Sequence, residues 1–218
     1  MVKNGIIISI GSGRSTSYKI TVRGRVFTEV DARDYCSLEP DKRYGQRGYN
    51  FDLLSNFPGD IFTEPELNVL NNATAAYEQR TKDLPISIQK KELERLVIEL
   101  SWKSSKIEGN TYTLLDTEKL ILENREAPGH DRKEAQMILN HKDAFNFVHE
   151  HQDNFKTLTR KNLEELHAII VKDLNVGLRL RQKPVGVLGS TYRPLDNIHQ
   201  IGEAIEDLSA AISRAGTP

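Results

Sequence analysis

Ser104, Glu108 and Gly109 are the residues of this 218-residue sequence whose types and spacing most clearly suggest chemistry. Positions 104 and 108 are four apart, so in a helix the hydroxyl and the carboxylate lie on one face. Gly109 and Asn110 indicate that the helix ends directly after Glu108. A carboxylate there faces the negative end of the helix dipole, which costs about 0.3–1 kcal/mol. Either Glu108 is an ordinary solvated side chain, or its charge has a role.

The helix that carries this group is predicted to extend from about residue 86 to residue 108. Its apolar residues recur at three- and four-residue spacings, which is typical of a helix with one buried face. These residues are Leu93, Leu96, Val97, Leu100 and Ile107. We therefore expect Ser104 and Glu108 to be held by a helix that packs on a core.

The segment Leu100-Ser-Trp-Lys-Ser-Ser-Lys-Ile-Glu-Gly-Asn-Thr-Tyr112 resembles the inhibitory helix of Fic-family proteins, which transfer AMP to other proteins. The family pattern is Ser or Thr, three residues, Glu, and then Gly or Asn. Ser104, Glu108 and Gly109 match all three positions. The resemblance implies an inhibitory helix over residues 86–109. In it, Glu108 would pair with an arginine of the family signature and block the productive pose of the ATP γ-phosphate, and Ser104 would help to hold the helix.

A second segment that resembles the family lies at residues 184–194, where the helical pattern breaks. In Fic proteins the corresponding segment is the flap, which holds a target polypeptide by main-chain pairing. The alternative is a plain connection between two helices. The resemblance implies a short flap hairpin and a protein as the partner. The matching residues are Val187, Leu188, Gly189, Ser190, Thr191 and Tyr192.

The catalytic signature of the family has no counterpart in these 218 residues. It consists of a His, a Phe, an acidic residue, Gly-Asn and two arginines, and it binds ATP and Mg²⁺ and activates the target hydroxyl. None of the six histidines is followed by that pattern. We therefore predict a truncated Fic protein with no catalytic residue and no metal ligand. ATP and Mg²⁺ are implied for its relatives, and we expect neither their binding nor AMP transfer by this chain alone.

An end before the signature helix would also affect folding. It would leave apolar faces near Ile170, Ile201 and Ile205 uncovered. Exposed apolar faces favour association between chains. We therefore expect self-association or marginal folding.

The first 28 residues are the basic part of the chain. They contain five Lys or Arg residues and no Asp or Glu, although the net charge of the whole chain is -1. Two β-branched runs, residues 5–10 and 17–22, flank a turn with glycines and predict a β-hairpin. This hairpin resembles the wing of a winged-helix DNA-binding domain. The alternative function is therefore a non-catalytic regulatory or DNA-binding module. Its candidate DNA contacts are Arg14, Lys19 and Arg23.

The fold class predicted for the whole chain is mainly α-helical, with a Fic-like helical core, a short flap hairpin and the N-terminal β-hairpin. We expect the basic hairpin at residues 1–28, a linker at 29–62, and the N-terminal part of a Fic domain at 63–218. The predicted helices lie near 65–81 and 86–108, from Thr113 to about 124, and from about 131, 159 and 196 onward.

Composition excludes several classes of protein. Charged residues make up 28% of the chain and are nearly balanced, so neither a disordered nor a membrane protein is indicated. Cys36 is the only cysteine, which rules out an intrachain disulfide and favours a reducing cytoplasm. The apolar run Ile6–Ile10 is too short for a membrane span or a signal segment. We expect a cytoplasmic protein with no membrane partner.

Overall fold

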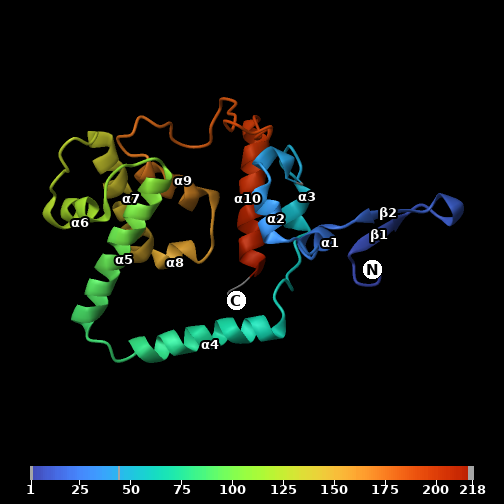
Figure 1. The fold of residues 1–218 in the computed structure, drawn as a ribbon, viewed down its shortest axis with the longest axis horizontal. Helices are drawn as coiled ribbons and strands as arrows, with labels where there is room; N and C mark the ends of the chain where they lie inside the picture. Colours follow the sequence, from blue (N-terminus) through green and yellow to red (C-terminus); the bar gives the residue numbers. More distant parts are fainter. Residues whose placement is uncertain (1, 44, 216–218) are drawn as a thin grey trace. The chain divides into compact units, whose positions relative to one another are not determined.

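The computed structural model describes residues 2–43 and 45–215. Helices predominate, and one short antiparallel hairpin precedes them, as the sequence predicts (Figure 1). The chain divides into two compact units: Met1–Leu70 with Gln182–Pro218, and Asn71–Arg181. None of the described helices has the length and hydropathy needed to cross a membrane.

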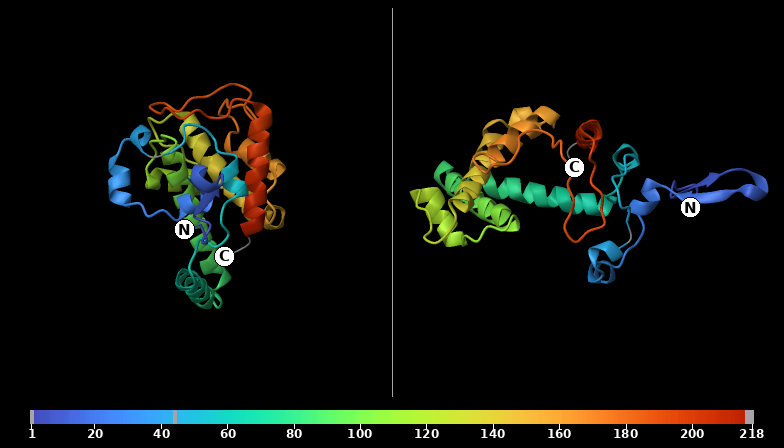
Figure 2. Two further views of the ribbon diagram at one scale, coloured as in Figure 1. Left: turned by 90° about the vertical axis from the view of Figure 1, so that its right-hand side faces the viewer. Right: turned by 90° about the horizontal axis from the view of Figure 1, so that it is seen from above.

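The first unit begins with the hairpin, in which β1 (Ile7–Ile10) pairs with β2 (Ser17–Ile20) (Figure 2). The second strand is shorter than predicted and ends before Thr21. The Thr21 hydroxyl accepts a hydrogen bond from the Gly24 N–H (3.0 Å), which starts a helix instead. The helical elements of this unit are α1 (Val22–Val26), α2 (Ala32–Ser37), a 3₁₀ turn (Pro40–Lys42), α3 (Asp52–Ser55) and α10 (Ile198–Ala215).

Helix α10 packs against α3 within the first unit. One hydrogen bond between them joins the Arg214 guanidinium to the Leu54 carbonyl (3.3 Å). Ile201 and Ile205, which we expected to be uncovered, are half-buried on α10. Helix α4 (Glu64–Thr81) starts in the first unit and ends in the second.

The second unit is built on α7 (Arg132–Glu150), which packs against α5 (Ile86–Ile107), α6 (Leu114–Glu123) and α9 (Arg160–Ile170). Local side-chain caps set where three of these helices begin, as the sequence predicts. Thr113 caps α6, Asp131 and Glu134 form a capping box on α7, and Thr159 caps α9. The short helix α8 (Gln152–Phe155) follows α7 directly.

The core of the second unit contains Tyr112, Leu120, Ala135 and Ile138. The face of α5 turned toward the core differs from the predicted one. Leu96 is 53% exposed and Ile107 is 85% exposed. The buried residues of α5 are Val97, Ile98, Ser101 and Ser105. Positions 97, 101 and 105 share one side of the helix, and small serines there suit close helix packing.

Candidate functional site at the end of α5 and in the 184–194 loop

Glu108 is the C-cap residue of α5, and two backbone hydrogen bonds end the helix around it. The Asn110 N–H donates to the Ser105 carbonyl (3.1 Å), and the Gly109 N–H donates to the Lys106 carbonyl (3.1 Å). Gly109 has φ +92°, the left-handed conformation that glycine adopts readily. This is the Schellman arrangement of a helix C-terminus. The prediction that Gly109 and Asn110 end the helix is confirmed.

Side chains of the core fix the loop that follows α5. Asn110 is buried, and its Nδ2 donates to the Glu134 carbonyl (2.8 Å) while its Oδ1 accepts from the Tyr112 N–H (3.0 Å). Trp102 Nε1 donates to the Tyr112 carbonyl (2.9 Å). The Thr111 N–H donates to the Glu134 carboxylate (2.6 Å), and this bond holds the pKa of Glu134 below its ordinary value. The backbone beside Glu108 is therefore well ordered by contacts.

The Glu108 side chain itself is exposed and makes no ion pair with any residue that the structure describes. Ser104 is half-buried, and no hydrogen bond joins it to Glu108 in the described ranges. The Glu108 charge has an electrostatic effect on His141 of α7. Burial lowers the pKa of His141, and Glu108 opposes that shift. The carboxylate is thus fixed in place at its backbone and free to accept a cationic partner.

Gly109→Ala is expected to lower the free energy of unfolding by about 1–2 kcal/mol, because a Cβ is strained in the left-handed conformation. An added Cβ would meet no atom within 4 Å, so the cost is purely conformational. Urea denaturation would measure it. Gly177→Ala is the matched control, since Gly177 is equally open and is not among the glycines with positive φ. Equal effects of the two substitutions would contradict the assignment.

Residues 184–194 form a loop with a turn rather than the predicted hairpin. The Ser190 N–H donates to the Val187 carbonyl (3.1 Å), and Gly189, with φ +73°, occupies the third position, as in a type II turn. Leu188 at the tip is fully exposed. The other exposed side chains of the matched segment are Val187, Thr191 and Tyr192.

In place of the predicted hairpin, two N–H groups near the end of this loop bond to earlier parts of the first unit. The Thr191 N–H donates to both carboxylate oxygens of Asp41 (2.9 and 2.8 Å), and the Ser190 hydroxyl donates to the same carboxylate (3.1 Å). The Arg193 N–H donates to the Arg47 carbonyl (2.7 Å). Asp41 therefore anchors the segment that the sequence predicts to be the flap.

The attachment of this loop to Asp41 is expected to depend on pH. The Thr191 N–H, followed by the Ser190 hydroxyl, holds the pKa of Asp41 below its ordinary value. The contact thus stabilises the fold above the unfolded-state pKa of about 3.9. This contribution is lost as the pH falls through the lower folded pKa. In ¹H–¹⁵N spectra, we expect the Thr191 amide resonance to move with a midpoint below about 3.9.

Asp41→Asn provides the control for this titration, because its amide oxygen can still accept a hydrogen bond from the Thr191 N–H and does not titrate. In the variant the Thr191 resonance should remain constant over the same pH range. An unchanged titration in the variant, or a wild-type midpoint at or above the ordinary value, would show that Asp41 does not hold the loop.

The three candidate DNA contacts differ in their surroundings. Arg14 and Lys19 are exposed, and no described residue forms an ion pair with either. Arg23 is paired with Asp60, and its hydrogen bond lowers the pKa of that carboxyl. Arg25, which the sequence pattern did not single out, is exposed and also has no ion-pair partner in the described part of the chain. The absence of acidic residues from the first 28 positions was the signal that could have found it.

Nowhere in residues 2–43 and 45–215 do three His, Cys, Asp or Glu side chains gather closely enough to hold a metal ion. Comparison of the chain with protein families, with curated proteins and with solved structures finds no match. The functional assignment therefore depends on the residues of the chain itself.

Proposed function

We propose that this chain provides the inhibitory helix and the target-binding flap of a Fic-type protein adenylyltransferase acting in the cytoplasm. The observation that carries the proposal is the state of Glu108, an exposed carboxylate without an ion-pair partner in the described ranges, on a helix end that is tightly fixed. In this function Glu108 pairs with an arginine of the catalytic signature. The pair excludes the productive pose of the ATP γ-phosphate.

The placement of Glu108 supports this role on electrostatic grounds. A carboxylate at the C-terminus of a helix is disfavoured by the helix dipole. A guanidinium that binds it forms a charge-assisted, bidentate pair and removes that penalty. Gly109 and the bonds of Asn110 keep the backbone of Glu108 at one position, so only side-chain freedom is lost when the partner arrives.

The loop at residues 184–194 supports the flap role. Its residues 184–187 are exposed, and the N–H groups of Val185 and Val187 donate to no described main-chain carbonyl. Free main-chain groups in an exposed segment are what a target polypeptide needs for strand pairing. Anchoring of Thr191 by Asp41 keeps one end of this segment in place.

ATP and Mg²⁺ belong to the proposed function through the signature, whose residues are not in this sequence. The chemistry that they supply is transfer of AMP to a target hydroxyl with release of pyrophosphate. The part of this chain is regulation and target binding. The purified 218-residue polypeptide should transfer no labelled AMP to protein.

Inhibition in trans tests the proposal. The chain is titrated into a reaction in which a Fic core with the signature, but without an inhibitory helix, transfers labelled AMP to protein. We expect the chain to suppress transfer. Glu108→Gln should weaken this suppression about tenfold or more, because the substitution removes one charge-assisted pair.

Glu94→Gln is the matched control, since Glu94 is an exposed glutamate on the same helix without an ion-pair partner in the described ranges. It should inhibit like the wild type. The proposal fails if the wild-type chain does not inhibit, or if the two variants inhibit equally well.

A further inference from the structure

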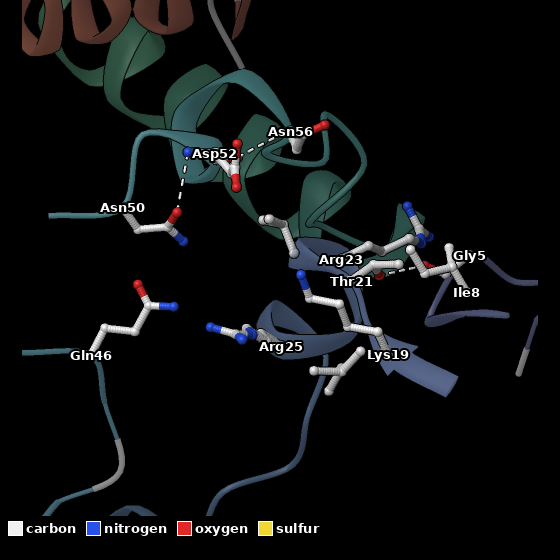
Figure 3. Close-up of a pocket in the computed structure, with 12 residues that line it drawn as sticks. Gly5, Ile8, Lys19, Thr21, Arg23, Arg25, Gln46, Asn50, Asp52 and Asn56 are labelled. Carbon is white, nitrogen blue, oxygen red and sulfur yellow. Dashed lines mark hydrogen bonds between the residues drawn. The ribbon is translucent and has the colours of Figure 1, made fainter. Parts of the chain in front are cut away.

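A pocket of about 420 Å³ lies between the N-terminal hairpin and residues 46–56, within the first unit (Figure 3). Lys19 from β2 and Arg25 from α1 line it on one side, and Gln46 and Asn50 line it on the other. Its wall also contains apolar side chains. These are Ile8, Ile20 and Val22.

Positive charge dominates the pocket. Lys19 and Arg25 have no ion-pair partner in the described ranges, whereas Arg23, also at the pocket, is neutralised by Asp60. One acidic residue lines the pocket, Asp52, and it lies beside Asn56 and away from Lys19 and Arg25 in Figure 3. The pocket therefore has two unpaired positive charges, Lys19 and Arg25, and one negative charge, Asp52. An anionic ligand would be attracted to the side formed by Lys19 and Arg25.

The amide side chains add uncharged hydrogen-bond donors. Asn50 Oδ1 accepts from the Asp52 N–H (3.1 Å), which orients the side chain and leaves its Nδ2 group available. Gln46 is exposed, and no hydrogen bond of its amide is found among the described residues. Cations combined with amide N–H donors match the oxygen atoms of a phosphate group.

Lys19 and Arg25 lie on elements that are packed tightly together, β2 and α1. Gly24 lies in α1 between Arg23 and Arg25, and an added Cβ there would come within 2.2 Å of the Ile6 carbonyl oxygen. The Thr21 N–H also donates to the Ile6 carbonyl (3.0 Å). This close contact fixes α1 against the hairpin. Lys19 and Arg25 are therefore presented together before any ligand binds, which favours affinity.

We propose that this pocket binds a phosphate group of a nucleotide, with Lys19 and Arg25 as its cationic contacts and Gln46 and Asn50 as amide donors. Its volume lies within the range of small-ligand sites. The phosphate is supplied either by a free nucleotide or by the backbone of a nucleic acid. Neither Glu108 nor any residue of the 184–194 loop lines this pocket.

Binding measurements on the full chain test the proposal with three probes: inorganic phosphate, AMP and a 20-nucleotide DNA. Lys19→Gln with Arg25→Gln should weaken binding about tenfold or more for each lost charge-assisted contact. If DNA is the ligand, the double variant should also reduce the slope of log affinity against log salt by about 1.4–1.8. Saturable binding of AMP identifies a free nucleotide, and binding of DNA alone identifies the backbone.

Lys3→Gln with Arg33→Gln is the matched control, because it removes two exposed cations of the first unit that neither line the pocket nor belong to the candidate DNA contacts. It should change the affinity by less than about twofold. Lys19→Arg with Arg25→Lys keeps both charges and should retain binding. The proposal is overturned if no probe binds, or if the two double Gln variants weaken binding equally.

Discussion

Ile138→Ala is expected to lower the free energy of unfolding of the second unit by about 2–5 kcal/mol. Ile138 is fully buried on α7 and packs with Tyr112, Leu120 and Ala135. Removing its outer carbon atoms takes away buried apolar surface and leaves a cavity among helices that can close only in part. Since domains are typically stable by about 5–15 kcal/mol, this loss is a large fraction of the total.

Chemical denaturation of the full chain, followed by circular dichroism, would measure the effect of Ile138→Ala. Two controls bracket it. Ile138→Val should cost about 0.5–1.5 kcal/mol. Ile86→Ala removes an isoleucine that is 71% exposed and should change stability by less than about 0.5 kcal/mol. A comparable loss for the substitutions at positions 138 and 86 would mean that the core does not lie where it is described.

Asn140→Ala is expected to destabilise the second unit by about 1–3 kcal/mol. The amide is almost completely buried and joins α7 to the end of α9. Its Nδ2 group donates to the Ile170 carbonyl (3.0 Å) and to the Lys172 carbonyl (2.7 Å), and its Oδ1 accepts from Gln136 (2.8 Å). Alanine removes all three bonds and leaves the carbonyls at the end of α9 without their donor.

The loss should also be local. Hydrogen exchange is expected to show weaker protection at the end of α9 in Asn140→Ala, because that end loses its connection to α7. Asn146→Ala is the matched control on the same helix, since no hydrogen bond of its side chain is found among the described residues. If Asn146→Ala were as destabilising as Asn140→Ala, the amide contacts would not explain the effect.

Features that depend on neighbouring residues in the sequence could be predicted. Thr113, Asp131 and Thr159 predict helix starts because an N-cap satisfies N–H groups only two or three positions away. Gly109 predicts a helix end for the same reason. The helical class and the places of the long helices follow from such local signals.

Features that depend on distant residues could not be predicted. The exposure of Leu96 and the burial of Ser101 depend on which side of α5 meets α7, and apolar spacing alone favoured another side. The absence of a hairpin at 184–194 depends on Asp41, which lies far away in the sequence. The same holds for the pocket, where Gln46 lies across from Lys19 of the hairpin and Arg25 of α1.

The division of the first unit into two stretches of sequence has a consequence for folding kinetics. The second unit is continuous, from Asn71 to Arg181, and contacts between near neighbours along a chain form quickly. The first unit forms only when the two stretches of sequence on either side of the second unit come together. Bringing them together costs the conformational entropy of closing a long loop. We therefore expect two kinetic phases in refolding, with the contact between Asp41 and Thr191 forming in the slower one.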